Sequence, residues 1–242
     1  IQHQGIADLS SPGQFVNIKV SDDLAPLLRR PFSISSSDRK NGWFEILFQV
    51  FGKGTEILSR FEPGVEIDFL GPLGNSFRIK DTLKNSILIA GGVGIAPLKF
   101  LSEQLNRKKI KTTLFWGARS AEMIKSYSDL LPDDNCKKYF STEDGSLGYQ
   151  GFITELFLEK IKIFDKNSSA VFSCGPNPML KKVKEIACNN SIPCQVSMET
   201  MMGCGFGACM GCNVLASGEN VAYYYVCTDG PVFNAEDIVF DD

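Results

Sequence analysis

Residues 87–101 read ILIAGGVGIAPLKFL, an apolar run that passes through three glycines into an amphipathic segment. The apolar run is typical of a buried strand, and the residues from 96 onward have helical spacing. Glycines at such a junction let the backbone approach a pyrophosphate, and the helix N-terminus behind them offers unpaired N–H groups. Gly91, Gly92 and Gly94 are therefore candidate nucleotide-binding residues, and a merely tight turn is the alternative.

Strand and helix patterns continue to alternate after this junction. TTLFWGAR (112–119) and AVFSCGP (170–176) are typical of strands, whereas APLKFLSEQLNRK (96–108) and NPMLKKVKEIACNN (177–190) are typical of helices. The alternation predicts a doubly wound parallel sheet, in which ligands bind at the carboxyl ends of the strands. Cys174, Gly175 and Pro176 stand at such an end, where Cys174 is either a neighbour of a nicotinamide ring or a buried thiol without a role.

A third strand end, KYFSTEDGSLGYQG (138–151), carries the carboxylates Glu143 and Asp144. In an adenosine pocket, carboxylates accept hydrogen bonds from ribose hydroxyls and repel a 2′-phosphate, which favours NAD over NADP. Arg119 and Ser120, after the preceding strand, would instead suit a phosphate. Solvated loop charges are the third interpretation of all four residues.

The N-terminal part has short alternating or apolar runs, QFVNIKV (14–20), FEILFQVF (44–51) and VEIDFLG (65–71), separated by Gly, Pro and Asp. This pattern predicts the antiparallel strands of a small barrel or sandwich. RRPFSISSS (29–37) places Arg30 beside Ser33, and Gly54 and Thr55 precede a short helix. An arginine fork and a helix start would suit a diphosphate, although a strand entry alone gives the same tetrapeptide.

Four cysteines cluster near the C-terminus, where METMMGCGFGACMGC (198–212) holds three of them and Cys227 follows. Four, two and fourteen residues separate Cys204, Cys209, Cys212 and Cys227, and the first two gaps match plant-type [2Fe–2S] ferredoxins. Structural zinc usually takes two close cysteine pairs, and only one is present here, so zinc and plain core cysteines are the weaker alternatives. The interspersed glycines would permit the positive φ angles of a loop around a cluster: Gly203, Gly205, Gly207 and Gly211.

Composition narrows the class of protein. Hydrophobic residues make up 43% of the 242 residues and charged residues 22%, as in globular proteins, and the net charge of −3 does not favour nucleic acid or anionic lipid. No apolar run is long enough for a membrane span, and the N-terminus lacks a signal-peptide pattern. We expect a cytoplasmic protein, and because the sequence begins without methionine we expect that residues precede it.

Cysteine and histidine usage limits the chemistry. In a cytoplasmic protein eight cysteines are not expected to form disulfides. The four scattered ones are predicted to be small buried hydrophobic residues: Cys136, Cys174, Cys188 and Cys194. The chain has a single histidine, His3, so histidine-based acid–base catalysis is unsupported and the chemistry is expected to come from a cofactor.

The order R-P-F-S, then G-T, then GGVGIAPL, then CGPNPML resembles the ferredoxin–NADP reductase superfamily. With the cysteine segment added, the chain resembles the electron-transfer subunits of NAD-linked type B dihydroorotate dehydrogenases from about Pro12 to its end. The resemblance implies a multi-domain α+β protein: an FAD-binding antiparallel β-barrel (1–81), an NAD-binding α/β domain (82–196) and a small [2Fe–2S] domain (197–242). Family members usually carry one more strand before P-G-Q-F than the twelve residues preceding Gly13 provide.

The resemblance also implies residue roles. The FAD contacts would be Arg30, Pro31, Phe32, Ser33, Leu47, Phe48, Gln49, Gly54 and Thr55, and the four clustered cysteines would hold the [2Fe–2S] cluster. The nicotinamide nucleotide would lie against the glycines of residues 91–94 and against Cys174, Gly175 and Pro176.

The implied function is electron transfer from the FMN of a catalytic partner subunit through the cluster and FAD to NAD, within a heterotetramer of two plus two subunits that forms orotate. A related reductase subunit of a hydrogenase, a sulfide dehydrogenase or a ferredoxin-linked NADP transhydrogenase is the first alternative. A non-catalytic zinc-stabilised module is the second.

Overall fold

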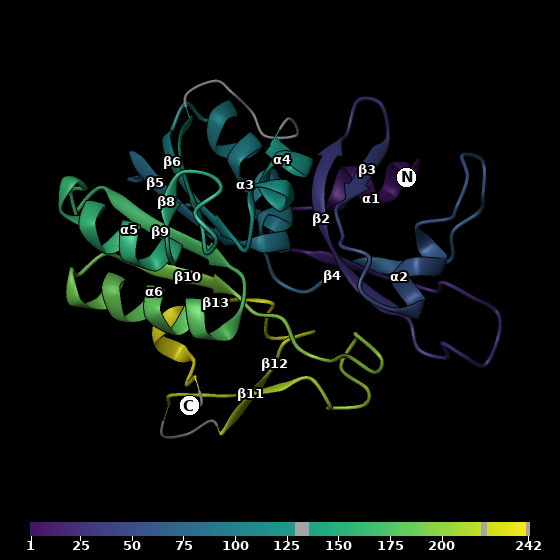
Figure 1. The fold of residues 1–242 in the computed structure, drawn as a ribbon. Helices are drawn as coiled ribbons and strands as arrows, with labels where there is room; N and C mark the ends of the chain where they lie inside the picture. Colours follow the sequence, from purple (N-terminus) through teal and green to yellow (C-terminus); the bar gives the residue numbers. More distant parts are fainter. Residues whose placement is uncertain (129–135, 219–221, 241–242) are drawn as a thin grey trace.

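The computed structural model describes residues 1–128, 136–218 and 222–240 of the chain. Within them a four-stranded antiparallel sheet, a seven-stranded mostly parallel sheet and a two-stranded sheet follow one another (Figure 1). The antiparallel sheet and the large sheet lie side by side, and helix α3 packs against strand β2 between them.

The antiparallel sheet has the strand order β3-β2-β1-β4. Its inward side chains, such as Val16, Ile18 and Ile34, are fully buried and form one core with Phe44. The sheet therefore matches the predicted antiparallel FAD-type domain. Its elements are α1 (Gln4–Leu9), β1 (Phe15–Ile18), β2 (Arg30–Asp38), β3 (Trp43–Ile46), α2 (Lys53–Leu58) and β4 (Phe69–Leu73).

The N-terminal residues are tied to this sheet. The Ile1 N-terminus donates to the Phe44 carbonyl at 2.9 Å, and the Phe44 N–H donates back to the Ile1 carbonyl at 3.0 Å. His3 then caps α1, because its Nδ1 accepts from the Ile6 N–H at 3.2 Å. Residues 1–3 thus pair with the edge of β3.

Two expected strands are shorter than their apolar runs. The run at 44–51 forms a strand only to Ile46, and the run at 65–71 starts as a strand only at Phe69. Beyond Ile46 the chain leaves the sheet, and Leu47 and Phe48 become the wall of a cavity. Apolar character there reflects a binding surface as well as a sheet core.

The large sheet has the strand order β13-β10-β9-β5-β6-β7-β8, and every pairing is parallel except that of β13 with β10. This confirms the parallel sheet predicted from alternating patterns. Its elements are β5 (Asn85–Gly91), η1 (Gly92–Gly94), α3 (Ile95–Arg107), β6 (Lys111–Ala118), α4 (Ala121–Ser128), β7 (Cys136–Thr142), β8 (Tyr149–Gln150), α5 (Ile153–Lys160), η2 (Ile161–Ile163), β9 (Ser169–Cys174), α6 (Asn177–Asn189) and β10 (Cys194–Ser197).

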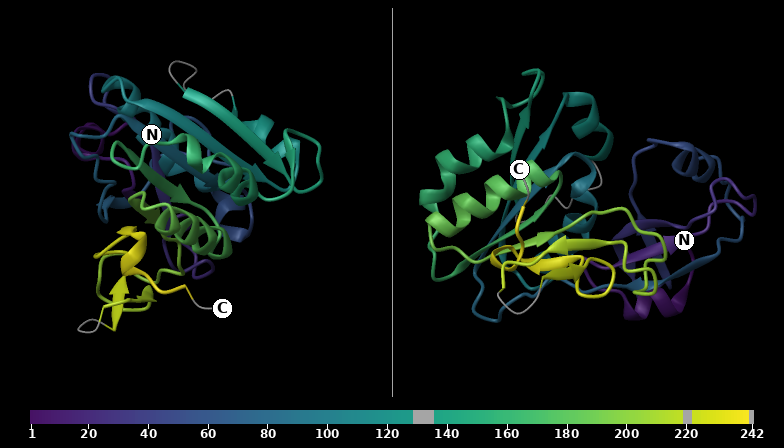
Figure 2. Two further views of the ribbon diagram at one scale, coloured as in Figure 1. Left: turned by 90° about the vertical axis from the view of Figure 1, so that its left-hand side faces the viewer. Right: turned by 90° about the horizontal axis from the view of Figure 1, so that it is seen from below.

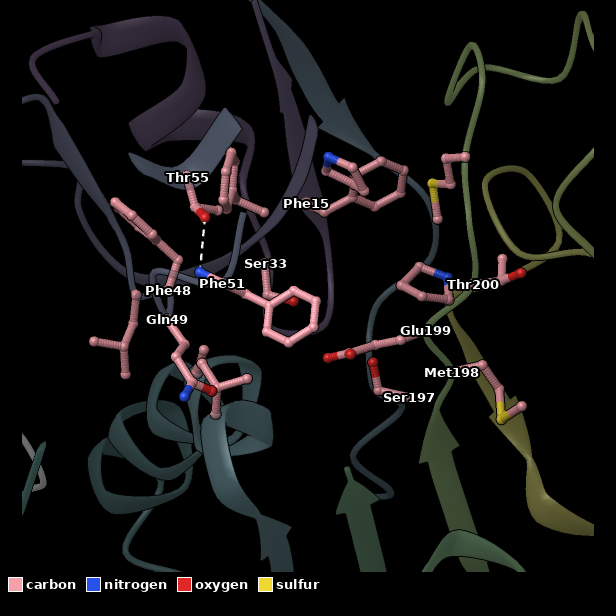
Figure 3. A pocket seen from close by; sticks show the side chains of 17 residues that line it. Phe15, Ser33, Phe48, Gln49, Phe51, Thr55, Ser197, Met198, Glu199 and Thr200 are labelled. Atoms are coloured by element: carbon pink, nitrogen blue, oxygen red, sulfur yellow. Dashed lines mark hydrogen bonds between the residues drawn. The ribbon is translucent and has the colours of Figure 1, made fainter. Parts of the chain in front are cut away.

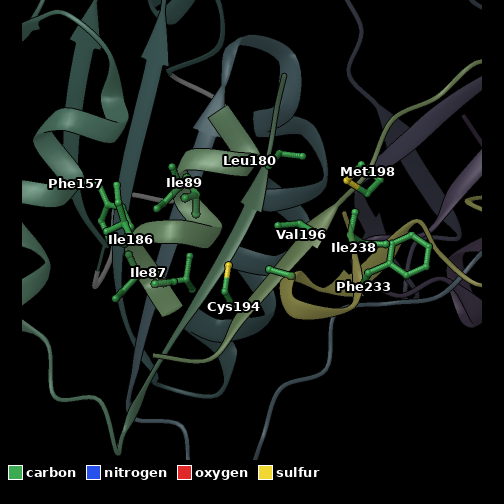
Figure 4. Close-up of a cluster of buried hydrophobic side chains, with 14 of the residues drawn as sticks. Ile87, Ile89, Phe157, Leu180, Ile186, Cys194, Val196, Met198, Phe233 and Ile238 are labelled. Atoms are coloured by element: carbon green, nitrogen blue, oxygen red, sulfur yellow. The ribbon is translucent and has the colours of Figure 1, made fainter. Parts of the chain in front are cut away.

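Helices cover both faces of this sheet. Ile87 and Ile89 of β5 pack with α5 and α6, whereas the alternate residues Leu88 and Ala90 pack with α3 and α4. Figure 4 shows the first of these cores, where Phe157 and Leu180 approach the strands from the helices. Because side chains alternate along a strand, a fully apolar strand needs cover on both faces.

The C-terminal segment does two things. Its strands β11 (Asn213–Leu215) and β12 (Tyr223–Tyr225) form a small sheet set apart from the large one (Figure 2). It then returns, because β13 (Val232–Asn234) joins the large sheet and η3 (Ala235–Asp237) leads to the fully buried Ile238. The segment after residue 197, which was expected to be a separate small domain, thus contributes its strand β13 to the large sheet.

The eight cysteines are free in the structure. Of the four scattered ones, Cys174 and Cys194 are buried, and Cys136 is half-buried. The expectation of a buried residue is wrong for Cys188, which is exposed near the end of α6. Its helix is amphipathic, and position 188 follows the buried Ala187 onto the solvent side.

Candidate functional site

A cavity of about 340 Å³ opens where β2 and the segment after β3 face the segment after β10; we call it the barrel cavity. Aromatic side chains line it, with a few polar groups between them (Figure 3). The rings of Phe32 and Phe48 pack at a tilt, with their centroids 5.3 Å apart. That mixture of an apolar wall and sparse polar atoms suits a flat heteroaromatic ligand. Seven predicted FAD residues line it: Pro31, Phe32, Ser33, Leu47, Phe48, Gln49 and Thr55.

The other two predicted FAD residues, Arg30 and Gly54, lie beside the barrel cavity and do not line it. The Arg30 guanidinium donates to the Leu28 carbonyl at 2.7 Å. The same side chain lies close to Gly54, because a Cβ added there would be 3.1 Å from the Arg30 Nε. The Thr55 side chain stabilises the first turn of α2, because its Oγ1 accepts from the Phe51 N–H at 2.9 Å (Figure 3). Arg30 thus reaches the N-terminal end of α2, where a diphosphate would meet both cation and N–H groups.

A second cavity of about 650 Å³, the sheet cavity, opens at the carboxyl ends of the parallel strands. The predicted residues Gly91, Gly92, Gly94, Glu143, Gly175 and Pro176 line it, as does Arg119. Ser141 lines it too, and its buried Oγ has no hydrogen-bond partner among the described residues. An orphaned hydroxyl in a glycine-lined cavity fits a nucleotide that would supply the missing partner.

Two predicted nucleotide residues do not line the sheet cavity. Asp144 instead holds its own turn, where its carboxylate accepts from the Ser146 N–H at 3.0 Å and the Ser146 hydroxyl at 2.6 Å. These hydrogen bonds lower the pKa of Asp144. Cys174 is fully buried behind the glycines, and that burial raises the pKa of its thiol. We therefore assign Asp144 to the turn, and of the two predicted carboxylates only Glu143 lines the cavity.

Glu199 is a residue that sequence reasoning missed. It lines both cavities, and its Oε1 lies 3.9 Å from the Cys174 Sγ. The residue is exposed at the surface, yet loss of solvent around its carboxyl, caused by the surrounding protein, raises the pKa of that carboxyl. Gln49, Phe51 and Val93 also line both cavities and so form a wall between them. The missed signal was position: residue 199 follows the carboxyl end of β10, where ligands of parallel sheets bind.

The cysteine loop starts at the rim of the barrel cavity. Thr200 and Met202 line that cavity, and Cys204 follows two residues later. The loop is fixed to the barrel, because the Asn17 Nδ2 donates to the Cys204 carbonyl at 2.7 Å. The candidate flavin position and the first cysteine are thus adjacent in space as well as in the chain.

Backbone N–H groups surround the sulfur atoms of the loop. Those of Ala208 and Cys209 donate to the Cys204 Sγ at 3.2 and 3.3 Å. Hydrogen bonding from the Phe206 N–H first, and then from these two, lowers the pKa of Cys204 to about 6. Because cysteines ligate iron as thiolates, this loop fits its predicted role.

The other two sulfurs form a close buried pair. The Cys212 Sγ lies 3.2 Å from the Cys227 Sγ, and burial together with Cys212 raises the pKa of Cys227 to about 11. The Gly207 N–H points to the same Cys227 sulfur, which joins the loop to the pair. In the described ranges no three His, Cys, Asp or Glu side chains already stand as a metal site.

Glycine is needed in the cysteine loop for backbone conformation at some positions and for space at another. Gly205 and Gly207 take φ values of 82° and 91°, as predicted for a loop that wraps a cluster. Gly203 and Gly211 do not have positive φ, which corrects the expectation for them. A Cβ on Gly203 would lie 3.2 Å from the Cys209 Sγ, so this glycine leaves room for the sulfur, whereas a Cβ on Gly211 would make only an ordinary contact at 3.7 Å.

Comparison with known families agrees with this order of sites. Residues 8–77 match the family described as "Oxidoreductase FAD-binding domain", and residues 88–185 match "Oxidoreductase NAD-binding domain". Residues 199–239 match "Iron-sulfur cluster binding domain of dihydroorotate dehydrogenase B". The predicted FAD, NAD and iron–sulfur cofactors are thereby confirmed at the level of domains, and the chain is an oxidoreductase subunit.

Full-length relatives identify the family. Proteins of Bacillus velezensis and Desulforamulus reducens, both named "Dihydroorotate dehydrogenase B (NAD(+)), electron transfer subunit", are 38% and 37% identical to this chain. The alignments cover 96% and 98% of this chain and 89% of each relative. The chain belongs to this family. The predicted resemblance is therefore confirmed over nearly the whole sequence.

A solved structure supports the same fold for this family member. A chain from the study of "the NADH-dependent reduced ferredoxin-NADP oxidoreductase structure" superposes with a TM-score of 0.83 at 28% identity, covering 99% of this chain and 83% of its own. This confirms the ferredoxin reductase type of architecture. Among the described helices, none has the length and apolar character that crossing a bilayer would require.

Nucleotide choice is predicted to depend on Glu143. Glu143→Arg is expected to shift the NADPH to NADH preference at least tenfold toward NADPH, because a charge-assisted phosphate contact is worth about 1.5–3 kcal/mol. The measurement is the ratio of kcat/KM values for the two nucleotides with a dye acceptor. Glu122→Arg makes the same charge change on exposed surface outside the cavity lining and should leave the ratio unchanged. An unmoved ratio in Glu143→Arg would remove this carboxylate from the ribose site.

Proposed function

We propose that this chain is the electron-transfer subunit of an NAD-linked dihydroorotate dehydrogenase, working in the cytoplasm with an FMN-containing catalytic subunit. FAD supplies the exchange between two-electron hydride chemistry and the one-electron chemistry of an iron–sulfur cluster. The chain's residues would hold three groups in a row. The observation that carries the proposal is this linear order of sheet cavity, barrel cavity and cysteine loop.

The shared wall between the cavities supports transfer between nucleotide and flavin. Gln49, Val93 and Glu199 line both cavities, so ligands in the two would lie on either side of the same few side chains. Phe51 stands in this wall with 93% of its surface exposed, an unusual position for a phenylalanine. The ring would cover a flat ligand and exclude water from it.

The surface of the cysteine loop supports docking of a partner. Met201, Phe206 and Met210 flank the cysteines, and they are 91%, 54% and 49% exposed. Exposed apolar side chains grouped in this way mark interaction surfaces. A partner seated there would reach the cluster position directly, whereas the sheet cavity would stay open to NAD.

Reconstitution tests the proposal. The FAD- and iron–sulfur-loaded chain, mixed with an FMN-containing subunit that oxidises dihydroorotate, is expected to give dihydroorotate-dependent reduction of NAD. Each component alone should give none, although this chain alone should pass electrons from NADH to a dye. Dye activity without any coupling to the catalytic subunit would reject the proposed partner.

A second candidate is a subunit of a ferredoxin-linked transhydrogenase. It is favoured by the 0.83 TM-score to a chain of such an oxidoreductase, which covers 99% of this chain. Reduced ferredoxin in place of dihydroorotate and its catalytic subunit distinguishes the two. NAD reduction that depends on ferredoxin alone would favour the second candidate.

A further inference from the structure

A third cavity lies on a different part of the molecule, where the end of β2 meets the C-terminal end of α3. Its volume is about 280 Å³, and its lining is basic and hydroxylic: Ser10, Ser37, Arg39, Gln104, Arg107 and Lys108, over the buried ring of Phe100. No residue of this lining belongs to the barrel cavity or to the sheet cavity. The feature therefore needs an explanation of its own.

The three cations of this cavity are available to a ligand. Within the described ranges Arg39, Arg107 and Lys108 form no ion pair, and no acidic side chain lines the cavity. Such a concentration of positive charge stands out in a chain with a net charge of −3. Side chains of this type would repel one another unless an anion or solvent lay between them.

Two carboxylates on the elements that form the cavity, Glu103 of α3 and Asp38 of β2, already accept hydrogen bonds from other groups. Glu103 accepts from the Lys99 Nζ at 3.0 Å and from the Ser36 hydroxyl at 2.7 Å. Asp38 accepts from the Asn41 side chain at 2.7 Å and from the Lys40 N–H at 2.8 Å. Hydrogen bonds from Asn41 first, and the charge of Arg107 last, lower the pKa of Asp38, so Asp38 offsets part of the positive charge. Among the described residues neither carboxylate forms an ion pair with the three cations, and neither lines the cavity.

A buried hydroxyl gives an independent sign of a ligand. Ser10 is 1% exposed, and its Oγ has no hydrogen-bond partner among the described residues. An unpaired buried hydroxyl costs free energy, and natural structures normally satisfy it with protein, water or a ligand. Ser37 is buried beside it, and its hydroxyl already donates to the Ala7 carbonyl at 3.1 Å, which leaves its oxygen free to accept or share.

We propose that this cavity binds a phosphate group, either as free phosphate or as the end of a small phosphomonoester. Two arginines and a lysine supply charge, and hydroxyl and amide groups supply further donors, which is the donor set that phosphate oxygens prefer. The volume lies at the small end for ligand pockets and suits a phosphate with few further atoms. The site is separate from the proposed electron-transfer function and does not depend on it.

Occupation of the cavity would join two domains. Ser10, Ser37 and Arg39 come from the barrel side, whereas Gln104 and Arg107 of α3 and its C-cap residue Lys108 come from the large-sheet domain. The other end of α3 carries the glycine turn that lines the sheet cavity. An anion held by both sides would stabilise the barrel against α3 and thereby raise the Tm.

Phosphate titration of the FAD-loaded protein, saturated with NAD to fill the sheet cavity and kept at constant ionic strength, tests the site. Calorimetry is expected to show one phosphate per chain, and ribose 5-phosphate as a second probe shows whether a monoester binds more tightly than the free anion. R39Q/R107Q should lower affinity at least tenfold, because it removes two charge-assisted contacts. The control K40Q/K111Q makes the same charge change on exposed lysines outside the cavity and should bind as wild type does.

Equal affinities of the two double variants would overturn the proposal, as would the absence of binding to wild type. Ser10→Ala gives a second readout that does not depend on charge. It is expected to weaken phosphate binding several-fold while leaving the Tm of the phosphate-free protein unchanged or higher. Unchanged affinity together with a higher Tm would show an unsatisfied hydroxyl without a ligand, which contradicts the site.

Discussion

Cys209→Ser is expected to abolish the visible absorbance of the iron–sulfur cluster and electron transfer to the partner, while FAD content and NADH–dye activity remain near those of wild type. Serine oxygen is a poor substitute for a soft thiolate, and three cysteines do not complete the set that such clusters use. Cys209 is exposed, and Gly203 leaves space around its sulfur. It lines neither cavity, so the nucleotide and flavin sites should be undisturbed.

Cys188→Ser is the matched control for this variant. Cys188 is also an exposed free cysteine, and its sulfur lies 4.0 Å from the Glu236 Oε1, away from the cysteine loop. We expect full cluster absorbance and full iron and sulfide content in the control. Normal iron and absorbance in Cys209→Ser would contradict the ligand assignment, and one zinc per chain in wild type would contradict the cluster itself.

The fold followed from patterns that are local in the chain. The strand ILIAGG and the helix after it form β5 and α3 because apolar runs and amphipathic spacing decide those elements without distant contacts. The same holds for β9 and α6. In contrast, β13 was not predicted, because Val232 and Phe233 form a strand only by pairing with β10 across the large-sheet core.

Site residues could be predicted where a local sequence pattern marks them. The loop N–H groups that meet the Cys204 sulfur follow from cysteine spacing and glycines, both visible in the sequence. Glu199 has no such signature, because its position between two cavities depends on how the domains meet. Asp144 was predicted as a ribose ligand from its place after a strand, and no sign in the sequence indicated that its carboxylate would accept hydrogen bonds from Ser146 two residues later.

Gly94→Ala is expected to destabilise the protein by about 1–3 kcal/mol, or roughly 3–10 °C in Tm, and to weaken NAD binding at least tenfold. The added Cβ would lie 2.3 Å from the Cys174 carbonyl oxygen and 2.9 Å from the Gly175 nitrogen. These are backbone atoms at the end of β9, so the strand end itself must shift. The shift would move the glycines that line the sheet cavity, because Gly94 and Gly175 both belong to its wall.

Gly218→Ala is the control, since among the described residues, its chain neighbours aside, no atom lies within 4 Å of the added Cβ. The Tm and NAD affinity of this variant should equal those of wild type. Thermal unfolding and NAD titration of the FAD-loaded protein measure both quantities. Neither Gly94 nor Gly175 lines the barrel cavity. Weakened NAD binding with unchanged FAD content would therefore show that the substitution perturbs the strand ends and not the barrel cavity. If Gly94→Ala bound NAD as tightly as Gly218→Ala, the close approach of η1 to the end of β9 would not be what shapes the nucleotide site.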